Sequence, residues 1–145
     1  MGTKTKALLT AIAWTPDYRI GIDAIDQDHE RLFTYFNELL RHLANDSSPE
    51  ATHAAIDRLE TIFKDHFDNE ETVMQSIGFP GFEGHKAKHQ TFLEMLRGLK
   101  AFHPGSQDFT DYFLRVFRNW IVYHITVNDR EIGQFLATVA GRVGG

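Results

Sequence analysis

The sequence contains no cysteine among its 145 residues. This absence excludes disulfides, iron–sulfur clusters and thiolate zinc sites, so any bound metal must be held by nitrogen and oxygen ligands. No apolar run approaches the roughly 20 residues that span a bilayer. Acidic residues outnumber basic ones by 20 to 15, and the chain has no basic stripe, which argues against a nucleic-acid partner. What remains is a chain of one-domain length, long enough to bury its own core.

The first residues carry an incomplete signal-peptide pattern. The apolar segment 7–13 follows two lysines and ends in Ala-x-Ala, but Thr10 interrupts it. It is also shorter than the ~15–30 residues of a secretory signal. We therefore expect a cytoplasmic protein, with no membrane partner, and its charge and patterning favour a monomer.

Three turn signals divide the chain at Asn45–Pro49, Gly78–Gly81 and His103–Ser106, and each combines Pro with a helix-stopping Gly, a capping Ser or both. Between them, apolar residues recur at helical spacing. The spacing predicts helices over about 23–44, 49–77, 82–102 and 107–129, with a short C-terminal helical extension. Because the connections are short, these helices should run antiparallel. We predict an all-α, up-down-up-down four-helix bundle that forms a single domain over residues 1–145.

Polar side chains interrupt the apolar stripes on all four helices. Five histidines and one glutamate stand where apolar residues are expected: His29, His66, Glu70, His85, His89 and His124. Burying such a group without a partner costs roughly 2–7 kcal/mol. A lone histidine on an apolar face is usually a hydrogen-bonded core residue, but here no Ser, Asn or Lys at stripe spacing is available to satisfy five of them. A shared metal site would satisfy them all.

The spacing of these residues supports a common centre. Two helices carry pairs four residues apart, which lie about 40° apart on one helical face: His66 with Glu70, and His85 with His89. Asp129 follows His124 by five residues, or about 140° on an ideal helix, and it turns inward only near a helix end or where the backbone loosens. The ideal spacing places Val127 on the inner stripe instead.

Seven candidate ligands exceed what one transition ion accepts, so the sequence predicts two metal ions. Histidine with carboxylate suits iron and leaves manganese or zinc open. Other polar residues are expected outside the centre. We predict that His42, His53 and His103 are solvated. Asp26 and Asp28 are expected to serve the start of the first helix, and Glu71 to lie off the stripe.

Between Trp14 and Asp129 the chain carries ordered motifs: Trp14–Phe33, which ends in Asp-Gln-Asp-His29-Glu-Arg-Leu-Phe33; His66-Phe-Asp-Asn-Glu70; His85-x-x-x-His89; and Trp120-x-x-x-His124-x-x-x-x-Asp129. This set resembles the hemerythrin family, specifically its bacterial single-domain branch. The similarity covers nearly the whole chain, with every ligand type in order. The resemblance implies a four-helix bundle with a non-haem di-iron centre that binds dioxygen reversibly.

The resemblance also implies a role for each residue. One iron would be held by His85, His89 and His124, and the other by His29 and His66. Glu70 and Asp129 would bridge the two irons, together with a solvent-derived oxo or hydroxo group. A count of these ligands leaves one position open, on the iron with two histidines, as a working site requires. Phe67, Trp120 and Ile121 match positions that line the family's oxygen pocket, although ordinary core packing also explains them.

Oxygen-activating di-iron enzymes tend to use a carboxylate-rich ligand set, whereas imidazole dominates here. We therefore expect an oxygen-binding protein for storage or delivery, with O2 as its ligand and an unidentified acceptor protein, and not an enzyme. Two alternatives stay open. They are a di-iron oxidase or peroxidase, and a sensor module for oxygen or iron.

Overall fold

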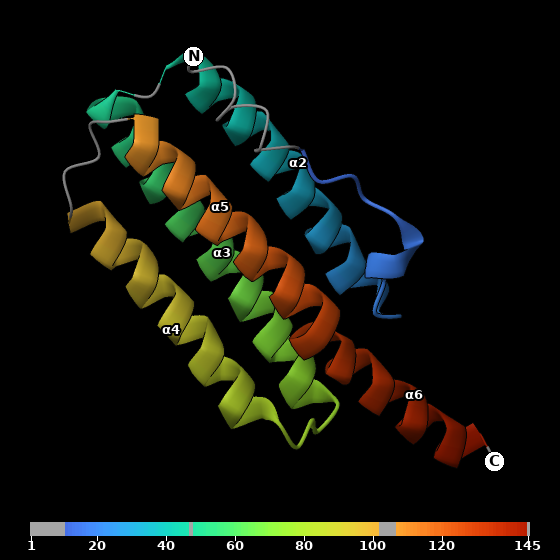
Figure 1. Cartoon of the computed structure of the whole chain (residues 1–145). Coiled ribbons are helices and arrows are strands. Elements are labelled where there is room, and N and C mark those ends of the chain that lie inside the picture. Colours follow the sequence, from blue (N-terminus) through green and yellow to red (C-terminus); the bar gives the residue numbers. More distant parts are fainter. Residues whose placement is uncertain (1–10, 47, 102–106, 145) are drawn as a thin grey trace.

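The computed structural model describes residues 11–46, 48–101 and 107–144. A short 3-10 helix, η1 (Pro16–Tyr18), precedes four long helices: α2 (Asp23–Asn45), α3 (Pro49–Ser76), α4 (Phe82–Ala101) and α5 (Gln107–Tyr123). These four helices lie alongside one another, and the chain reverses direction at each connection (Figure 1). The described residues contain no strand. The predicted fold class, an all-α up-down-up-down bundle, is confirmed.

The last helix continues beyond the bundle. A π-helical turn, η2 (His124–Asp129), joins α5 to α6 (Arg130–Gly144), and α6 projects past the end of the other helices (Figure 1). This is the predicted C-terminal extension. The predicted turn at 103–106, the end of the third helix at 102 and the start of the apolar segment at 7–10 fall outside the described residues, as does residue 47. No described helix is both long and apolar enough to cross a membrane.

Local capping sets the ends of α3. Ser48 accepts a hydrogen bond from the backbone N–H of Ala51 at 3.2 Å, and Pro49 occupies the first helical position. At the other end Gly78 adopts a φ of 69°, in the left-handed region that favours glycine. The chain then folds back so that the N–H of Phe79 bonds to the carbonyl of Met74 at 2.9 Å. This turn brings the end of α3 beside the start of α4, where four of the candidate ligands lie.

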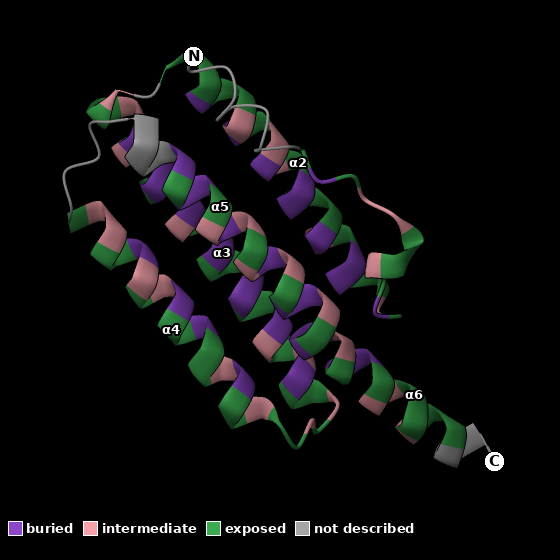
Figure 2. Ribbon diagram, in the orientation of Figure 1, coloured by how far each residue is buried: buried purple, intermediate pink, exposed green. Residues whose placement is uncertain are grey.

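Aromatic rings fill the centre of the bundle, and buried residues recur along each of its helices as successive turns pass the inner face (Figure 2). Phe36 of α2 stacks on Phe117 of α5, with ring centroids 5.4 Å apart. Phe63 of α3 makes edge contacts with Phe117 and Phe67 at 5.3 and 5.5 Å. The buried polar side chains lie next to this apolar core, which separates them from water.

The π-helical turn changes which residues face inward near the end of the bundle. Each π turn holds about one residue more than an α turn, so residues five apart come into line. His124 and Asp129 are 3% and 0% exposed, while Val127 is 39% exposed. The prediction that Val127 faces inward is therefore wrong, because it assumed ideal α-helical spacing. The loosened backbone that Asp129 needs is this turn.

Residues 11–22, the N-terminal arm, are held by contacts with the start of α2 and the start of α6. Asp26 accepts hydrogen bonds from the backbone N–H groups of Ile20 at 2.8 Å and Gly21 at 3.2 Å. Arg130 donates to the backbone carbonyl of Asp17. Asp26 was predicted to serve the start of its helix. It does lie in the first turn of α2, and its side chain also binds the segment that precedes the helix.

Gly133 makes this fastening possible, and its replacement by alanine is expected to destabilise the protein. A Cβ at Gly133 would lie 1.7 Å from the carbonyl oxygen of Ile20, so the arm and α6 would have to separate. Forcing extra atoms into such a contact costs about 1–3 kcal/mol, or about 2–4 °C in Tm for each kcal/mol. Thermal denaturation measures this loss. A Cβ at Gly141 of the same helix would meet no atom within 4 Å, so Gly141→Ala is the matched control and should not lower Tm.

Candidate metal centre

All seven predicted ligands converge in one buried cluster inside the bundle. They come from α2, α3, α4 and η2, and each is at most 5% exposed: His29, His66, Glu70, His85, His89, His124 and Asp129. Their ligand atoms form two groups that share both carboxylates. Within each group these atoms lie within 4.8 Å of one another.

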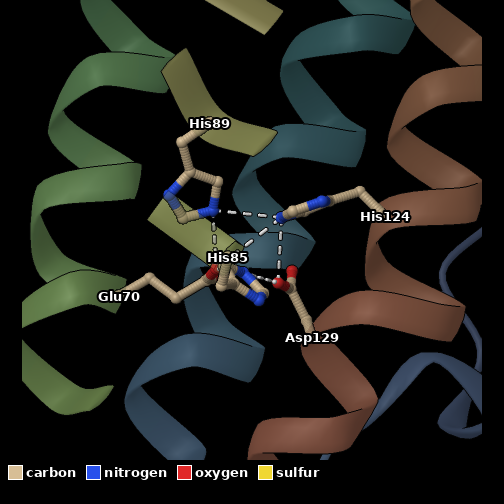
Figure 3. Close-up of side chains that lie close together, drawn as sticks. All are labelled: Glu70, His85, His89, His124 and Asp129. Atoms are coloured by element: carbon tan, nitrogen blue, oxygen red, sulfur yellow. Dashed lines mark hydrogen bonds and ion pairs between the residues drawn. The ribbon is translucent and has the colours of Figure 1, made fainter. Parts of the chain in front are cut away.

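The first group contains three histidines (Figure 3). The Nε2 atom of His85 lies 2.7 Å from Oε1 of Glu70 and 2.9 Å from Oδ1 of Asp129. His89 approaches the same Glu70 oxygen at 3.0 Å, and His124 approaches the same Asp129 oxygen at 3.0 Å. Three imidazole nitrogens from two helical segments thus face one oxygen of each carboxylate.

The second group contains two histidines and uses the other oxygen of each carboxylate. Nε2 of His29 lies 2.9 Å from Oδ2 of Asp129, and Nε2 of His66 lies 3.2 Å from Oε2 of Glu70. His29 is also 3.5 Å from that Glu70 oxygen. Glu70 and Asp129 therefore stand between the two histidine groups, each with one oxygen toward either side. This is the arrangement of carboxylates that bridge two metal ions.

The donor atoms fit metal ions better than they fit one another. The Nε2 atoms of His89 and His124 are 3.1 Å apart, so at most one of them carries a proton in that contact. Nε2 of His29, Oε2 of Glu70 and both carboxylate oxygens of Asp129 are buried, and although they lie 2.9–3.5 Å from one another or from other ligand nitrogens, none of them makes a well-aligned hydrogen bond within the described residues. Such orphaned buried groups are costly unless something else satisfies them. Nitrogen and carboxylate donors converging in this way suit first-row transition metals such as iron.

The buried charges shift the pKa values of the cluster. Burial lowers the pKa of His66, but hydrogen bonds to Asp28 and Glu70 outweigh burial and raise it to about 10. Burial likewise opposes protonation of His124, whose pKa the Asp129 charge raises to about 9. Burial and the Glu70 charge raise the pKa of Asp129, but His124 holds it below its ordinary value. Without metal, the cluster thus stores protons on imidazoles beside ionised carboxylates.

Metal loading is therefore expected to release protons. At pH 7 the metal-free protein holds protons on His66 and His124, whose pKa values are about 10 and about 9, and metal ions bind only the neutral imidazole. We expect at least two protons released per chain, and an affinity that rises with pH by roughly tenfold per unit for each proton displaced. Titration calorimetry in buffers of different ionisation enthalpy measures the release. A binding enthalpy independent of the buffer would contradict it.

The same pKa values predict how the metal-free fold responds to pH. Both histidines have folded-state pKa values above the ordinary 6.5. Their contribution to stability is therefore complete below pH 6.5 and disappears as the pH rises through about 9 and about 10.

Three further side chains hold the outer nitrogens of the candidate ligands. Nδ1 of His66 lies 3.4 Å from Asp28, and Nδ1 of His89 lies 2.9 Å from Glu71. Nδ1 of His124 lies 3.1 Å from Asn128. Asp28, Glu71 and Asn128 are the outer partners of the cluster. Sequence reasoning missed all three. Asp28 was assigned to the helix start, which is wrong because its side chain reaches His66 on a neighbouring helix. Glu71 lies off the inward stripe, as predicted, but its contact with His89 on the neighbouring helix was not foreseen.

The three predicted pocket residues lie in or beside the aromatic core. Phe67 stacks on His89, with centroids 3.9 Å apart and planes at 6°, and Trp120 stacks on His124 at 4.4 Å and 12°. Phe67 is buried and Trp120 is half-buried. Ile121 is 1% exposed and belongs to the apolar core. The rings of Phe67 and Trp120 thus form an apolar wall beside the three-histidine group.

The remaining histidines lie outside the cluster. His42 is exposed, as predicted. His53 is only half-exposed, and its Nε2 atom is buried, so the prediction that it is solvated is only partly right. His103 lies outside the described residues.

Comparison with known proteins gives one consistent result. The chain is 29% identical over 123 residues to a bacteriohemerythrin of Stenotrophomonas maltophilia, covering 84% of this chain and 79% of that protein. It is 29% identical over 131 residues to a bacteriohemerythrin of Methylococcus capsulatus (89% and 99%), and 28% identical over 116 residues to the myohemerythrin of Theromyzon tessulatum (80% and 86%).

The fold is shared as well. A crystal structure of a hemerythrin point mutant superposes with a TM-score of 0.73 at 26% identity, covering 86% of this chain and 97% of the other. The family model described as the hemerythrin HHE cation binding domain matches residues 20–136, a range that contains all seven clustered side chains. The chain therefore belongs to the hemerythrin family of cation-binding four-helix bundles.

Proposed function

We propose that this protein binds dioxygen reversibly at two iron ions. One ion would be held by His85, His89 and His124, and the other by His29 and His66. One observation carries the proposal: Glu70 and Asp129 each direct one oxygen toward either histidine group. Two carboxylates so placed are bridging ligands for a pair of ions. Iron bound there would supply two electrons and an open coordination position for dioxygen.

The residues around the centre set its charge and its access to water. The imidazole Nε2 atoms point inward, and the two carboxylates would offset the positive charge of bound metal ions. Phe67 and Trp120 cover the three-histidine group with aromatic rings, and Phe63 lies beside His66. An apolar enclosure of this kind keeps water and protons from the centre, which favours release of the ligand unchanged.

The donor set also favours binding over oxidation. Five neutral imidazoles and two carboxylates offer less negative charge to highly oxidised iron than the carboxylate-rich sets of di-iron oxygenases. We therefore propose a carrier that stores oxygen or delivers it to an acceptor protein, rather than an enzyme or a sensor. As part of the same proposal, it works as a monomer in the cytoplasm.

The absorption spectrum of the iron-loaded protein tests this function. We expect charge-transfer bands to appear when the reduced protein meets air and to disappear when oxygen is removed, over repeated cycles. Zinc-loaded protein is the control and should show no bands, because zinc has no redox chemistry. Irreversible bleaching, release of hydrogen peroxide or turnover of an added substrate would contradict carriage and indicate an oxidase or peroxidase.

A further inference from the structure

The two outer carboxylates each reach across from one helix to the next. Asp28 lies on α2 and contacts His66 on α3, whereas Glu71 lies on α3 and contacts His89 on α4. Each follows or precedes an inward-facing member of the cluster in the sequence. Successive residues of an α-helix lie about 100° apart. A residue next to an inward-facing ligand therefore faces sideways, toward the adjoining helix.

These contacts determine where each imidazole carries its proton. A carboxylate only accepts hydrogen bonds, so the nitrogen that faces it, Nδ1, must carry the hydrogen. Nε2 of the same ring faces the centre, 3.2 Å from Glu70 in His66 and 3.0 Å in His89, and is the nitrogen left to bind a metal ion, which displaces any proton it carries. This is the tautomer that binds a metal ion through Nε2.

We propose that Asp28 and Glu71 are positioning residues that hold His66 and His89 in their metal-binding tautomer and orientation. The inference rests on the proposed function, because it requires the cluster to hold metal. Their side chains are only 19% and 17% exposed, so water competes weakly for these contacts. Asp28 is itself fixed by Arg31 at 3.0 Å and by Asn69 at 3.5 Å. A negative charge at this distance also makes the imidazole a stronger donor.

The two residues are expected to differ in importance. The Glu71 contact is shorter, 2.9 Å against 3.4 Å. Yet His66 is one of only two imidazoles in its group, whereas His89 is one of three. Weakening one of two nitrogen ligands removes a larger share of the binding than weakening one of three. Loss of the Asp28 carboxylate should therefore release the ion of the two-histidine group first.

The test uses the full-length, iron-loaded protein with the isosteric variants Asp28→Asn and Glu71→Gln. The measurements are iron content per chain, the rate of iron loss to a chelator and the midpoint reduction potential. We expect both variants to lose iron about 10–100-fold faster, with the larger effect in Asp28→Asn. The potential should move upward, because a ring without its carboxylate stabilises the ferric state less.

Matched controls come from carboxylates of α3 that also reach across to a neighbouring helix. Asp57 and Glu60 of α3 pair with Lys100 and Arg97 of α4, and neither contacts a candidate ligand. Asp57→Asn and Glu60→Gln should leave the potential and the rate of iron loss unchanged.

The outcomes separate this inference from the proposed function. A parent protein that binds no iron would contradict the function itself. A parent that holds two irons, with variants that lose iron at the parent rate and keep its potential, would overturn the positioning role alone. Thermal melts of the metal-free variants complete the test. Variants that melt earlier than the metal-free parent but keep its potential would show a purely structural role and would also overturn the inference.

Discussion

Replacement of Glu70 by glutamine is expected to abolish the binding of at least one of the two iron ions. Glu70 is completely buried and directs Oε1 toward the three-histidine group and Oε2 toward the two-histidine group. The amide of glutamine is neutral and offers only one acceptor atom, so it serves at most one of the two groups. Because metal binding is coupled to folding, the melting temperature of protein purified with iron should fall together with its iron content.

Elemental analysis of iron and differential scanning calorimetry measure the two effects in one preparation. Glu83→Gln provides the control, since Glu83 is an exposed carboxylate in the first turn of α4. It should retain the iron content and melting temperature of the parent. Unchanged iron content in Glu70→Gln would contradict the assignment of Glu70 as a shared ligand.

The second large effect is expected from Phe63→Ala, in the core beside the centre. Phe63 is 1% exposed, and its ring contacts the rings of Phe67, Phe92, Phe117 and Trp120 at centroid distances of 5.0 to 6.2 Å. Removing a buried phenylalanine ring costs about 3–5 kcal/mol, because the surrounding side chains only partly fill the space. For a chain of this length, this loss corresponds to a fall in Tm of about 6–20 °C.

Urea denaturation of the metal-free protein measures this loss without a contribution from bound iron. Tyr112→Ala is the control, because Tyr112 is 59% exposed and its truncation should change stability by about 0.5 kcal/mol or less. A loss below about 1 kcal/mol in Phe63→Ala would contradict a tightly packed aromatic core.

The bundle and six of the seven clustered side chains, all but Asp129, were predictable from the sequence for a single reason. Helical periodicity decides which side chains face inward, and polar residues on an inward face need partners. His66 with Glu70, and His85 with His89, follow this rule with four-residue spacing. The structure places both pairs where the periodicity predicts them.

The π-helical turn marks the limit of that rule. His124 and Asp129 are five residues apart, and an ideal α-helix would bury Val127 and turn Asp129 sideways. The chain adopts a locally wider turn, which buries Asn128 and Asp129 and exposes Val127. Periodicity alone gives no indication of such a turn, and only the need to bring Asp129 inward pointed to it.

Contacts between helices were not predictable for a different reason. Whether Asp28 and Glu71 face water or a neighbouring histidine depends on how closely α2, α3 and α4 approach, and no intrahelical spacing encodes this. The same holds for Gly133, whose missing side chain matters only because the Ile20 carbonyl lies against it. One signal was present: a carboxylate directly beside an inward-facing ligand in the sequence.

Anomalous diffraction at the iron edge, from crystals of the iron-loaded protein, tests the central claim most directly. The account predicts two iron peaks inside the bundle, one against His85, His89 and His124 and the other against His29 and His66, with Glu70 and Asp129 touching both. An interior without iron peaks, or iron bound only at surface histidines such as His42, would contradict it.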